Sequence, residues 1–568
     1  RGLCRSLTFG DKKFNKTGMY WEPEVIDMLS LRILKGDPEA ALKEPYSIIL
    51  SETVAEAFFE DEDPMGKTLR VNNKSDVKVT GVYEDLPHSS NFRDMGFIMP
   101  WELYLIESEW IKNMDNPWGS NFTQTWAQVA DNADMDLVSA KIVDVKLKKV
   151  DEGGRKYKPE VFLHPMSKWH LYSDFRDGKN VGGRIEFVWM FRMIGVFVLL
   201  LACINFMNLS TARSEKRAKE VGIRKSVGSM RSQLIKQFYS ESILVTLFAF
   251  VFSLILVLLA LPFFNDVAGK QIALPWASPV FWLVCLAFSL VTGVVAGSYP
   301  ALYLSSFQPV KVLKGTFRVG RLASLPRQVL VVLQFSVSVA LIIGTVVVFR
   351  QIEFAKNRPI GYERNGLINV YLQTQDIHNH FEAVRNELLS QGAILEMTEA
   401  GSPTTQVWNT NGGFTWSGKD PGLAVDFPNN AVTHEFGKTV GWNFKAGRDF
   451  SREFASDFTA FVINEATAKF LGFEEPIGET LTWNGVNYTI IGVIEDMVIE
   501  SPYEPVRASL WHIDRYNNVN LAILKLNPDL SAHEAIEKVK AVFTKYNPES
   551  PFTHEFVDQE YARKFTNE

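Results

Sequence analysis

Four long apolar stretches constrain this chain more than any other feature of its sequence. They run over Val188–Leu209, Ser242–Phe264, Pro279–Leu304 and Val329–Phe349. The first carries one charged residue, Arg192, and the other three carry none. A helix needs about 20 mainly apolar residues to cross a bilayer. The sequence therefore predicts four membrane-spanning helices, although 22% of all residues are charged, as in an ordinary globular protein.

The loops between these stretches differ in charge, and the difference predicts how the chain crosses the membrane. Segment 211–241 holds eight basic residues against three acidic ones, and segment 305–327 holds five basic residues and no acidic one. Segment 265–279 holds only Lys270 and Asp266. Because cytoplasmic loops carry an excess of Lys and Arg, we expect the first two segments inside and the third outside. Alternating crossings then place both soluble ends outside the cytoplasm.

The predicted fold class is an α+β membrane protein, with four transmembrane helices flanked by two related αβ extracytoplasmic domains. The predicted regions are a soluble domain at 1–180, three helices at 185–305, a basic linker at 306–327, a fourth helix at 328–350 and a second soluble domain at 355–568. The chain starts at Arg1, without a signal peptide pattern, and starts and ends amid soluble sequence. We therefore expect a fragment that is cut at both ends.

An internal repeat links the two soluble regions. Residues 48–85 and 461–496 align with two single-residue gaps. The matched positions are Glu52 with Glu465, Ala55 with Ala468, Pro64 with Pro476, Gly66 with Gly478, Leu69 with Leu481, Gly81-Val82 with Gly492-Val493, and Glu84-Asp85 with Glu495-Asp496. Each copy is typical of a short helix, a Pro-x-Gly turn and two strands. We expect one shared fold, and a weaker match of 34–37 with 445–449 upstream.

No stretch of the chain has the pattern of a nucleotide site. PMGKTL at 64–69 resembles part of a phosphate loop, but Asp61 stands where the first glycine is needed, and Glu479 replaces the lysine in the repeat. The histidines form no metal-ligand spacing, and His378 and His380 are expected on the surface. We therefore predict no catalytic, cofactor or metal site, and any ATPase that drives the protein would be a separate chain.

The basic segment 211–241 is the most informative short stretch. Five apolar residues fall at helical spacing along it: Ile223, Val227, Met230, Leu234 and Phe238. Because Gly222 and Gly228 interrupt it, we expect a short helix set at an angle to its neighbours. This helix could lie on the bilayer surface as an anchor, or dock on a cytoplasmic partner as a coupling element.

Pro300, in the third apolar stretch, predicts a kink or a helix end, and a capped end would explain both Pro300 and Pro309.

Three segments resemble the FtsX/MacB-type ABC permeases. AKEVGIRKSVGSMRSQLIKQFYSES resembles the region after the first helix of their conserved membrane domain, and YPALYLSSFQPVKVLKG resembles the exit of its third helix. SETVAEAFF, DPMGKTL and VKVTGVYEDLP resemble the MacB-type periplasmic core domain. The duplicated plan is similar to large bacterial permeases with two such halves. On that plan this chain lacks the N-terminal helix and the last three.

The resemblance implies a permease that is not itself an enzyme. Such permeases couple ATP hydrolysis by a cytoplasmic ABC ATPase to movement of periplasmic domains, and seldom pass substrate through their helices. By position, the residues that match the cytoplasmic motif are Glu220, Gly222, Arg224, Lys225 and Gly228, and with Arg231 they are predicted to contact that ATPase. Ser226-Val227 replaces the usual Ala-Leu, a conservative departure.

Three functions remain open on the sequence. The first is export or efflux of a drug, peptide or lipoprotein. The second is mechanotransmission or signalling without transport, such as activation of a wall hydrolase or sensing of an antimicrobial peptide. The third is a docking platform for a periplasmic adaptor. All three imply a multi-pass protein of the cell inner membrane, compatible with a homodimer or pseudo-dimer, and no nucleic-acid partner.

Overall fold

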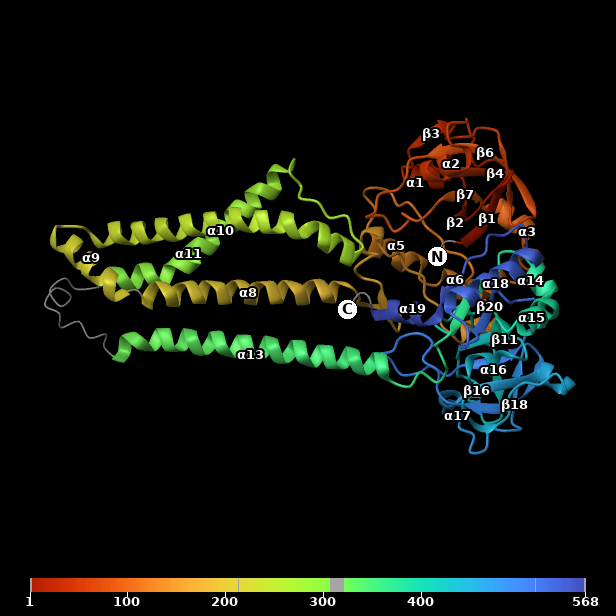
Figure 1. Cartoon of the computed structure of the whole chain (residues 1–568). Helices are drawn as coiled ribbons and strands as arrows, with labels where there is room; N and C mark the ends of the chain where they lie inside the picture. Colours follow the sequence, from red (N-terminus) through yellow and green to blue (C-terminus); the bar gives the residue numbers. More distant parts are fainter. Residues whose placement is uncertain (1–2, 213, 307–320, 516, 566–568) are drawn as a thin grey trace. The chain divides into compact units, whose positions relative to one another are not determined.

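The structure of the protein, a computed structural model, describes residues 3–212, 214–306, 321–515 and 517–565 (Figure 1). It divides into two compact units. One consists of Arg1–Leu163 with Ile352–Glu568 and holds two β-rich domains, and the other is His164–Gln351. Most of the predicted basic linker, with Pro309, lies outside the described residues. Residues 164–180, and a small hairpin of β8 (Asp174–Arg176) and β9 (Lys179–Gly182), belong with the second unit.

The first core domain is a small closed sheet. Its strands are β1 (Leu3–Phe9), β2 (Lys12–Trp21), β3 (Ile33–Gly36), β4 (Ser47–Ser51), β5 (Thr68–Val71), β6 (Ser75–Tyr83) and β7 (Phe97–Pro100). They are ordered β3-β6-β4-β7-β2-β1-β5, and β5 also pairs with β6, which closes the sheet into a barrel. Buried Ile48, Leu69 and Phe97 lie in its core.

The first core domain also contains short helices. They are α1 (Val25–Met28), α2 (Glu52–Phe59), α3 (Trp101–Glu107), α4 (Glu109–Lys112), α5 (Met135–Ile142), α6 (Val145–Lys149) and α7 (Glu152–Arg155). The helix α2 buries Val54, Phe58 and Phe59 against the barrel. Its apolar residues recur at helical spacing, which is why this segment of the repeat is helical rather than extended.

The second core domain repeats this barrel and adds a layer. Its strands are β10 (Leu367–Tyr371), β11 (Ile394–Ala400), β12 (Thr410–Asn411), β13 (Thr415–Trp416), β14 (Phe427–Val432), β15 (Phe444–Gly447), β16 (Ala460–Asn464), β17 (Thr480–Trp483), β18 (Val486–Ile494), β19 (Leu510–Ile513), β20 (Leu521–Leu526) and β21 (Glu555–Phe556). Its helices are α14 (Asp376–Asn379), α15 (Phe381–Ser390), α16 (Phe436–Val440), α17 (Glu465–Leu471), α18 (Ala532–Tyr546) and α19 (Val557–Ala562). The added strands β11, β20 and β10 share a core with α15 and α18.

The two barrels have the same strand order and the same register. The order β3-β6-β4-β7-β2 of the first corresponds to β15-β18-β16-β19-β14 of the second. The strand β1, which pairs with β2 and β5, corresponds to the short strands β12 and β13, which pair with β14 and β17. The parallel pairs β4–β6 and β16–β18 share a register shift after Ile48 and after Phe461. The predicted duplication of one αβ fold is confirmed.

The residues that match in the repeat have the same structural roles in both copies. Gly36 and Gly447 have φ of +100° and +76°, and a Cβ on either would lie 2.4 and 2.2 Å from a backbone oxygen of the neighbouring strand. Only glycine fits there. Asp85 accepts a hydrogen bond from the first turn of α2, and Asp496 accepts one from the first turn of α17. These carboxylates stabilise the helix N-termini, which explains the Glu-Asp pair that ends each copy.

The segment that resembles a phosphate loop is a turn between a helix and a strand. Gly66 has φ of +76°, and its N–H donates to the Val79 carbonyl at 2.9 Å. Gly478 makes the same bond to Ile490 at 2.8 Å. The strand β5 follows this turn, whereas a phosphate loop leads into a helix. The turn is therefore a structural element of the repeat.

Four helices in the described part of the chain are long and apolar enough to cross a membrane, which confirms the predicted spans. They are Ile185–Leu209 in α8 (Ile185–Ala212), α10 (Arg231–Ala268), α11 (Pro279–Ser305) and Gln328–Asn357 in α13 (Arg321–Asn357) (Figure 1). Their apolar windows are at most 22% buried inside the protein. Helices with such exposed apolar surfaces satisfy their own backbone and need lipid around them.

The helix α11 differs from its prediction. It runs through Pro300 to Ser305, so the alternative of a helix end at Pro300 is wrong. Ala301 and Leu304, beyond the proline, are buried against α10 and hold this last turn in place. Earlier in α11, a Cβ on Gly293 or Gly297 would come within 3.0 Å of atoms of α10. Two glycines four residues apart thus let the two helices approach closely.

Candidate functional site

The predicted coupling segment forms two helices joined by a tight turn. The first, α9 (Ser214–Ser226), lies between the end of α8 and the start of α10 (Figure 1). Gly228, in the turn, has φ of +103°. Its N–H donates to the Lys225 carbonyl at 3.2 Å, and the Ser229 N–H donates to the Arg224 carbonyl at 3.0 Å. This is the pattern of a Schellman C-cap, in which glycine takes the left-handed position.

The turn splits the predicted apolar stripe into two surfaces. Leu234 and Phe238, in α10, are buried. The other three members are exposed: Ile223 by 53%, Val227 by 84% and Met230 by 68%. The predicted short helix is present as α9, and the Gly228 turn ends it and redirects the chain into α10, so the stripe is divided between the two helices. We call the exposed set Ile223, Val227 and Met230 the junction edge.

Arg224 and Glu220 connect α9 to α10 rather than standing apart in solvent. The Arg224 guanidinium donates to the Glu220 carboxylate at 2.6 Å and to the Gln237 side chain at 2.6 Å. The ion pair is half-exposed and by itself contributes at most about 1 kcal/mol. Gly222 lies inside α9 and is buried, so it does not interrupt that helix.

Lys225 and Arg231 both reach the end of α11. The Lys225 ammonium donates to the Ser305 carbonyl at 2.6 Å, and the Arg231 Nε donates to the Ser305 hydroxyl at 3.4 Å. Ser305 is the last residue of α11 and is fully buried. A helix C-terminus carries partial negative charge, which favours these cations. Burial and the nearby Arg231 guanidinium lower the pKa of Lys225.

An apolar core lies behind these polar contacts. It is formed by Val221 of α9, Leu234 and Phe238 of α10, and Ala301 and Leu304 of α11. Burying one Val, Leu or Phe side chain contributes about 1.5–3 kcal/mol. The three helix ends are therefore held as one body, and a force on α9 acts on α10 and α11 together.

Sequence reasoning missed part of this arrangement. The six predicted residues are brought into one region, but their contacts with Ser305 of α11 and Gln237 of α10 were not predicted, although both residues lie in the segments that resemble the family. The junction edge could have been found from Gly228, because a glycine after a basic helical run marks a C-cap and a change of direction. Arg213 lies outside the described residues.

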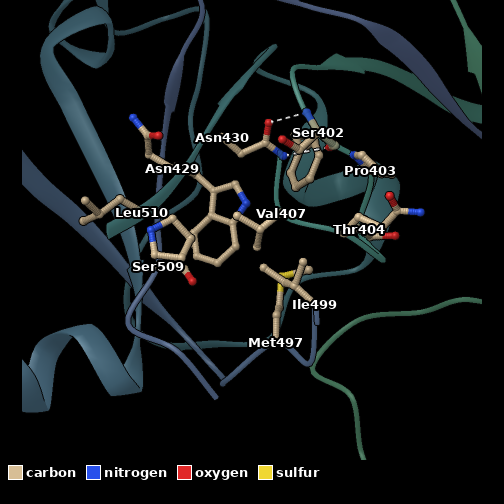
Figure 2. A pocket seen from close by; sticks show the side chains of 14 residues that line it. Ser402, Pro403, Thr404, Val407, Asn429, Asn430, Met497, Ile499, Ser509 and Leu510 are labelled. Carbon is tan, nitrogen blue, oxygen red and sulfur yellow. Dashed lines mark hydrogen bonds between the residues drawn. The ribbon is translucent and has the colours of Figure 1, made fainter. Parts of the chain in front are cut away.

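A small cavity in the second core domain is the next candidate. Ser402 and Asn430, at its edge, exchange two hydrogen bonds of 2.9 Å, drawn as dashed lines in Figure 2. Ser509, Leu510 and Met497 also line it (Figure 2). Its free volume is about 20 Å³, which is enough for about one water molecule. This cavity is part of the core and not a ligand site.

His378 corrects one prediction, since it is not a simple surface residue. Its side chain is 21% exposed, and its Nδ1 lies 2.7 Å from Oε2 of the fully buried Glu399. Burial disfavours the charged ring, but the Glu399 carboxylate outweighs it and raises the pKa of His378. In the described ranges, no group of three or more His, Cys, Asp or Glu residues is placed to hold a metal ion.

Family models match most of the chain. A model described as the MacB-like periplasmic core domain matches residues 3–145 and 329–542. A second, described as the FtsX-like permease C-terminal, matches residues 192–309 and so includes α9 and the junction edge. The two matches together cover both core domains and the membrane helices between them.

Two curated relatives cover about half of the chain. The uncharacterized ABC transporter permease YknZ of Bacillus subtilis is 25% identical over 273 residues, which is 47% of this chain and 61% of YknZ. The macrolide export ATP-binding/permease protein MacB of Bdellovibrio bacteriovorus is 23% identical over 270 residues, which is 47% of this chain and 38% of MacB. In both cases the matched part is less than two thirds of the relative.

The periplasmic region of MacB from Actinobacillus actinomycetemcomitans is a solved structure similar to part of the chain. It aligns with a TM-score of 0.26 and 14% identity, covering 36% of this chain and 94% of that structure. A TM-score this low does not establish a shared fold. The assignment of the chain rests on the family models.

Proposed function

The chain belongs to the MacB-type ABC transporter permeases with an FtsX-like membrane domain, and from this membership we propose that it couples ATP hydrolysis by a separate cytoplasmic subunit to motion of its two extracytoplasmic core domains. The observation that carries the proposal is the junction of α9, α10 and α11. Its apolar core, and the contacts of Arg224 and Lys225, join the basic loop helix α9 to two membrane helices.

The junction edge is the part of this region that the ATPase subunit contacts first in our proposal. Its three apolar side chains are more than half exposed in a loop that carries an excess of basic residues. Apolar groups gathered on a polar surface mark a contact site more often than scattered ones do. A compact helix that presents them could receive a push from a neighbouring subunit.

The six predicted residues take distinct roles in this proposal. Glu220 and Arg224 are exposed enough to meet the partner, and Arg224 also contacts α10. Lys225 and Arg231 transmit force to α11 through Ser305. Gly228 acts through the backbone, since it makes the turn that sets the junction edge, and Gly222 lies buried within α9.

We propose export of a drug, peptide or lipoprotein as the outcome of the motion, ahead of signalling without transport. The relative from Bdellovibrio bacteriovorus is named a macrolide export protein, which favours export. The proposed location is a cell inner membrane, with both core domains outside the cytoplasm, in agreement with the basic loops 211–241 and 305–327. A periplasmic adaptor and a homodimeric or pseudo-dimeric assembly remain part of the proposal.

Co-purification of the full chain with its cognate ATPase subunit tests the contact. Val227→Asp places a charge at the most exposed member of the junction edge and should lower association by about tenfold or more, since central apolar contacts dominate interfaces. Lys270→Glu is the matched control. Lys270 follows α10 in the loop before α11, and the change should leave association unaltered. Unchanged association of Val227→Asp would rule out the junction edge as the contact.

A further inference from the structure

A groove beside the first core barrel combines aromatic and acidic side chains. Its volume is about 1050 Å³, and its lining includes Tyr46, Asp76, Glu107, Glu109 and Trp110. This is at the upper end of the volumes that hold small molecules. The groove is open to solvent, so a segment of a longer chain can enter it.

The aromatic side of the groove is exposed but held in place. Trp110 and Tyr46 are each 48% exposed. The Trp110 ring packs edge-on against Phe122 with 4.9 Å between centroids, so its exposed face has a fixed direction. Ile106 adds a third apolar group that is 37% exposed. Indole and phenol faces attract cations through their negative electrostatic potential, and also bury apolar side chains.

The lining is acidic on balance, with Asp76, Glu107 and Glu109 against one basic residue, Lys74. The Glu107 carboxylate accepts hydrogen bonds from two neutral donors, the Ser75 and Tyr20 hydroxyls. Among the described residues neither Glu107 nor Glu109 makes an ion pair with a basic side chain, and Asp76 is 3.9 Å from Arg70. Carboxylates fixed by neutral donors and left without a cation are complementary to an ammonium or guanidinium group.

The second core domain shows that the barrel does not need this groove. In the first domain, β7 is followed by a segment, 101–126, that contains four tryptophans. In the second, β19 is followed by residues 514–520, which contain none, and the chain then enters β20. The aromatic segment is therefore an addition to the shared fold, and its exposed tryptophan is not explained by folding of the barrel.

We propose that this groove binds a cationic, amphipathic peptide segment. Its Lys or Arg side chains lie against Glu107 and Glu109, and its apolar side chains lie against Trp110, Tyr46 and Ile106. The proposal deepens the proposed function, because it names the class of ligand that the outer domains would take. Binding itself does not require the ATPase subunit, so it can fail while the contact at the junction edge stands.

The test uses the full chain in lipid nanodiscs and two short peptides, with empty nanodiscs subtracted. The peptides are acetyl-Lys-Phe-Lys-Leu-amide and its neutral analogue, acetyl-Gln-Phe-Gln-Leu-amide, each labelled with a fluorophore for anisotropy. The cationic peptide should bind at least about tenfold more tightly than the neutral one, and its affinity should fall as salt rises to about 0.5 M. Equal binding of the two peptides, or no binding of the cationic one, would overturn the proposal.

Two variants and a control locate the site. Glu107→Gln keeps an acceptor for one of the two hydroxyls and removes the charge, and Trp110→Ala removes the aromatic face. Each should weaken binding of the cationic peptide by about fivefold or more. Trp118→Ala removes another exposed tryptophan of the same segment, 41% exposed and outside the groove lining, and should change binding by less than about twofold. Equal losses for Trp110→Ala and Trp118→Ala would contradict the assignment to this groove.

Discussion

The two core domains share a barrel but differ in how polar groups are used within it. In the second, the fully buried Asp457 accepts two hydrogen bonds of 2.7 Å from Arg448. In the first, an exposed cation beside Gly36, Lys35, meets Asp63 at 3.2 Å with both side chains more than half exposed. The same strand order therefore does not require the same stabilising contacts.

This comparison separates the residues that specify the barrel from the contacts and segments that occur in only one copy. Both copies keep the left-handed glycines and the carboxylates that cap α2 and α17. Only the second has a buried polar network around Asn464, and only the first has the segment with four tryptophans. The shared positions specify the fold. The second copy has gained buried polar contacts, and the first has gained a surface that could bind a ligand.

Removal of the buried carboxylate should give the largest difference between the copies. Asp457→Ala leaves Arg448 without its partner and should lower the free energy of unfolding of the second core domain by about 3–5 kcal/mol. Asp63→Ala, which removes the exposed ion pair of the first domain, should lower that domain's unfolding free energy by less than about 1 kcal/mol. Hydrogen exchange of β16 and β4 amides in the full chain measures each domain. Equal losses of unfolding free energy for the two variants would show that the buried and the exposed ion pair stabilise their domains alike.

The shared glycines should, in contrast, behave alike. Gly36→Ala and Gly447→Ala each force a Cβ into a backbone oxygen and a left-handed φ on alanine, and each should cost about 2–4 kcal/mol in its own domain. Gly485→Ala is the control, because Gly485 has φ of +74° but no atom within 4 Å of its Cβ. It should cost about 1 kcal/mol. A large loss of unfolding free energy for only one of the two variants would show that the matched glycines do not have equivalent roles.

Asp449 should make the second core domain sensitive to pH. Its pKa is raised to about 6, mainly by burial, with the Asp457 and Glu435 carboxylates adding to the rise. Between pH of about 4 and about 6, the folded state keeps a proton that the unfolded state has lost. The contribution of Asp449 to the free energy of unfolding therefore falls as pH rises through this window, by about 2–3 kcal/mol in all, and is flat above it.

Asp449→Asn removes that titration. The difference in unfolding free energy between the unsubstituted chain and this variant should decline across the window when measured by exchange of β16 amides, corrected for intrinsic exchange rates. The β4 amides of the first core domain provide an internal control and should show no such decline. A difference that is constant with pH would show that Asp449 titrates alike in the folded and unfolded states.

The smallest expected contrast concerns the two helix caps. Asn464 accepts hydrogen bonds from Thr467 and Ser509, and its amide donates to a backbone carbonyl, all in the core. Ser51, at the matched position, makes no side-chain cap bond. Asn464→Ala should cost about 1–2 kcal/mol, and Ser51→Ala less than about 0.5 kcal/mol. Thermal unfolding of the full chain, with exchange to assign the domain, measures both.

Much of the fold could be predicted because its signals are local in the sequence. The four spans follow from apolar length, and the repeat gave the helix, turn and strands of both copies. The start of α10 at Arg231, well before the predicted Ser242, could not be predicted. The spacing of Leu234 and Phe238 predicted a helix between these residues, but not that this helix continues without a break into the span. Leu234 and Phe238 pack against α11 and hold this first part of α10 in place.

The location of the candidate site along the chain could be predicted, but the contacts that its residues make could not. The family motif identified Arg224 and Lys225, but their partners Gln237 and Ser305 lie 13 and 80 residues away along the chain. Contacts over such distances depend on how α10 and α11 cross, which is set by Gly293 and Gly297. For the same reason the exposure of Val227 and Met230 followed from the turn at Gly228 and not from helical periodicity.

The central claim is tested most directly by the rate of ATP hydrolysis of the cognate ATPase subunit. This rate is measured with and without the full chain in nanodiscs. The full chain should raise that rate, Val227→Asp should return it to that of the ATPase alone, and Lys270→Glu should leave the stimulation intact. Stimulation that survives Val227→Asp, or hydrolysis by the full chain without the subunit, would contradict a permease that receives force at the junction edge.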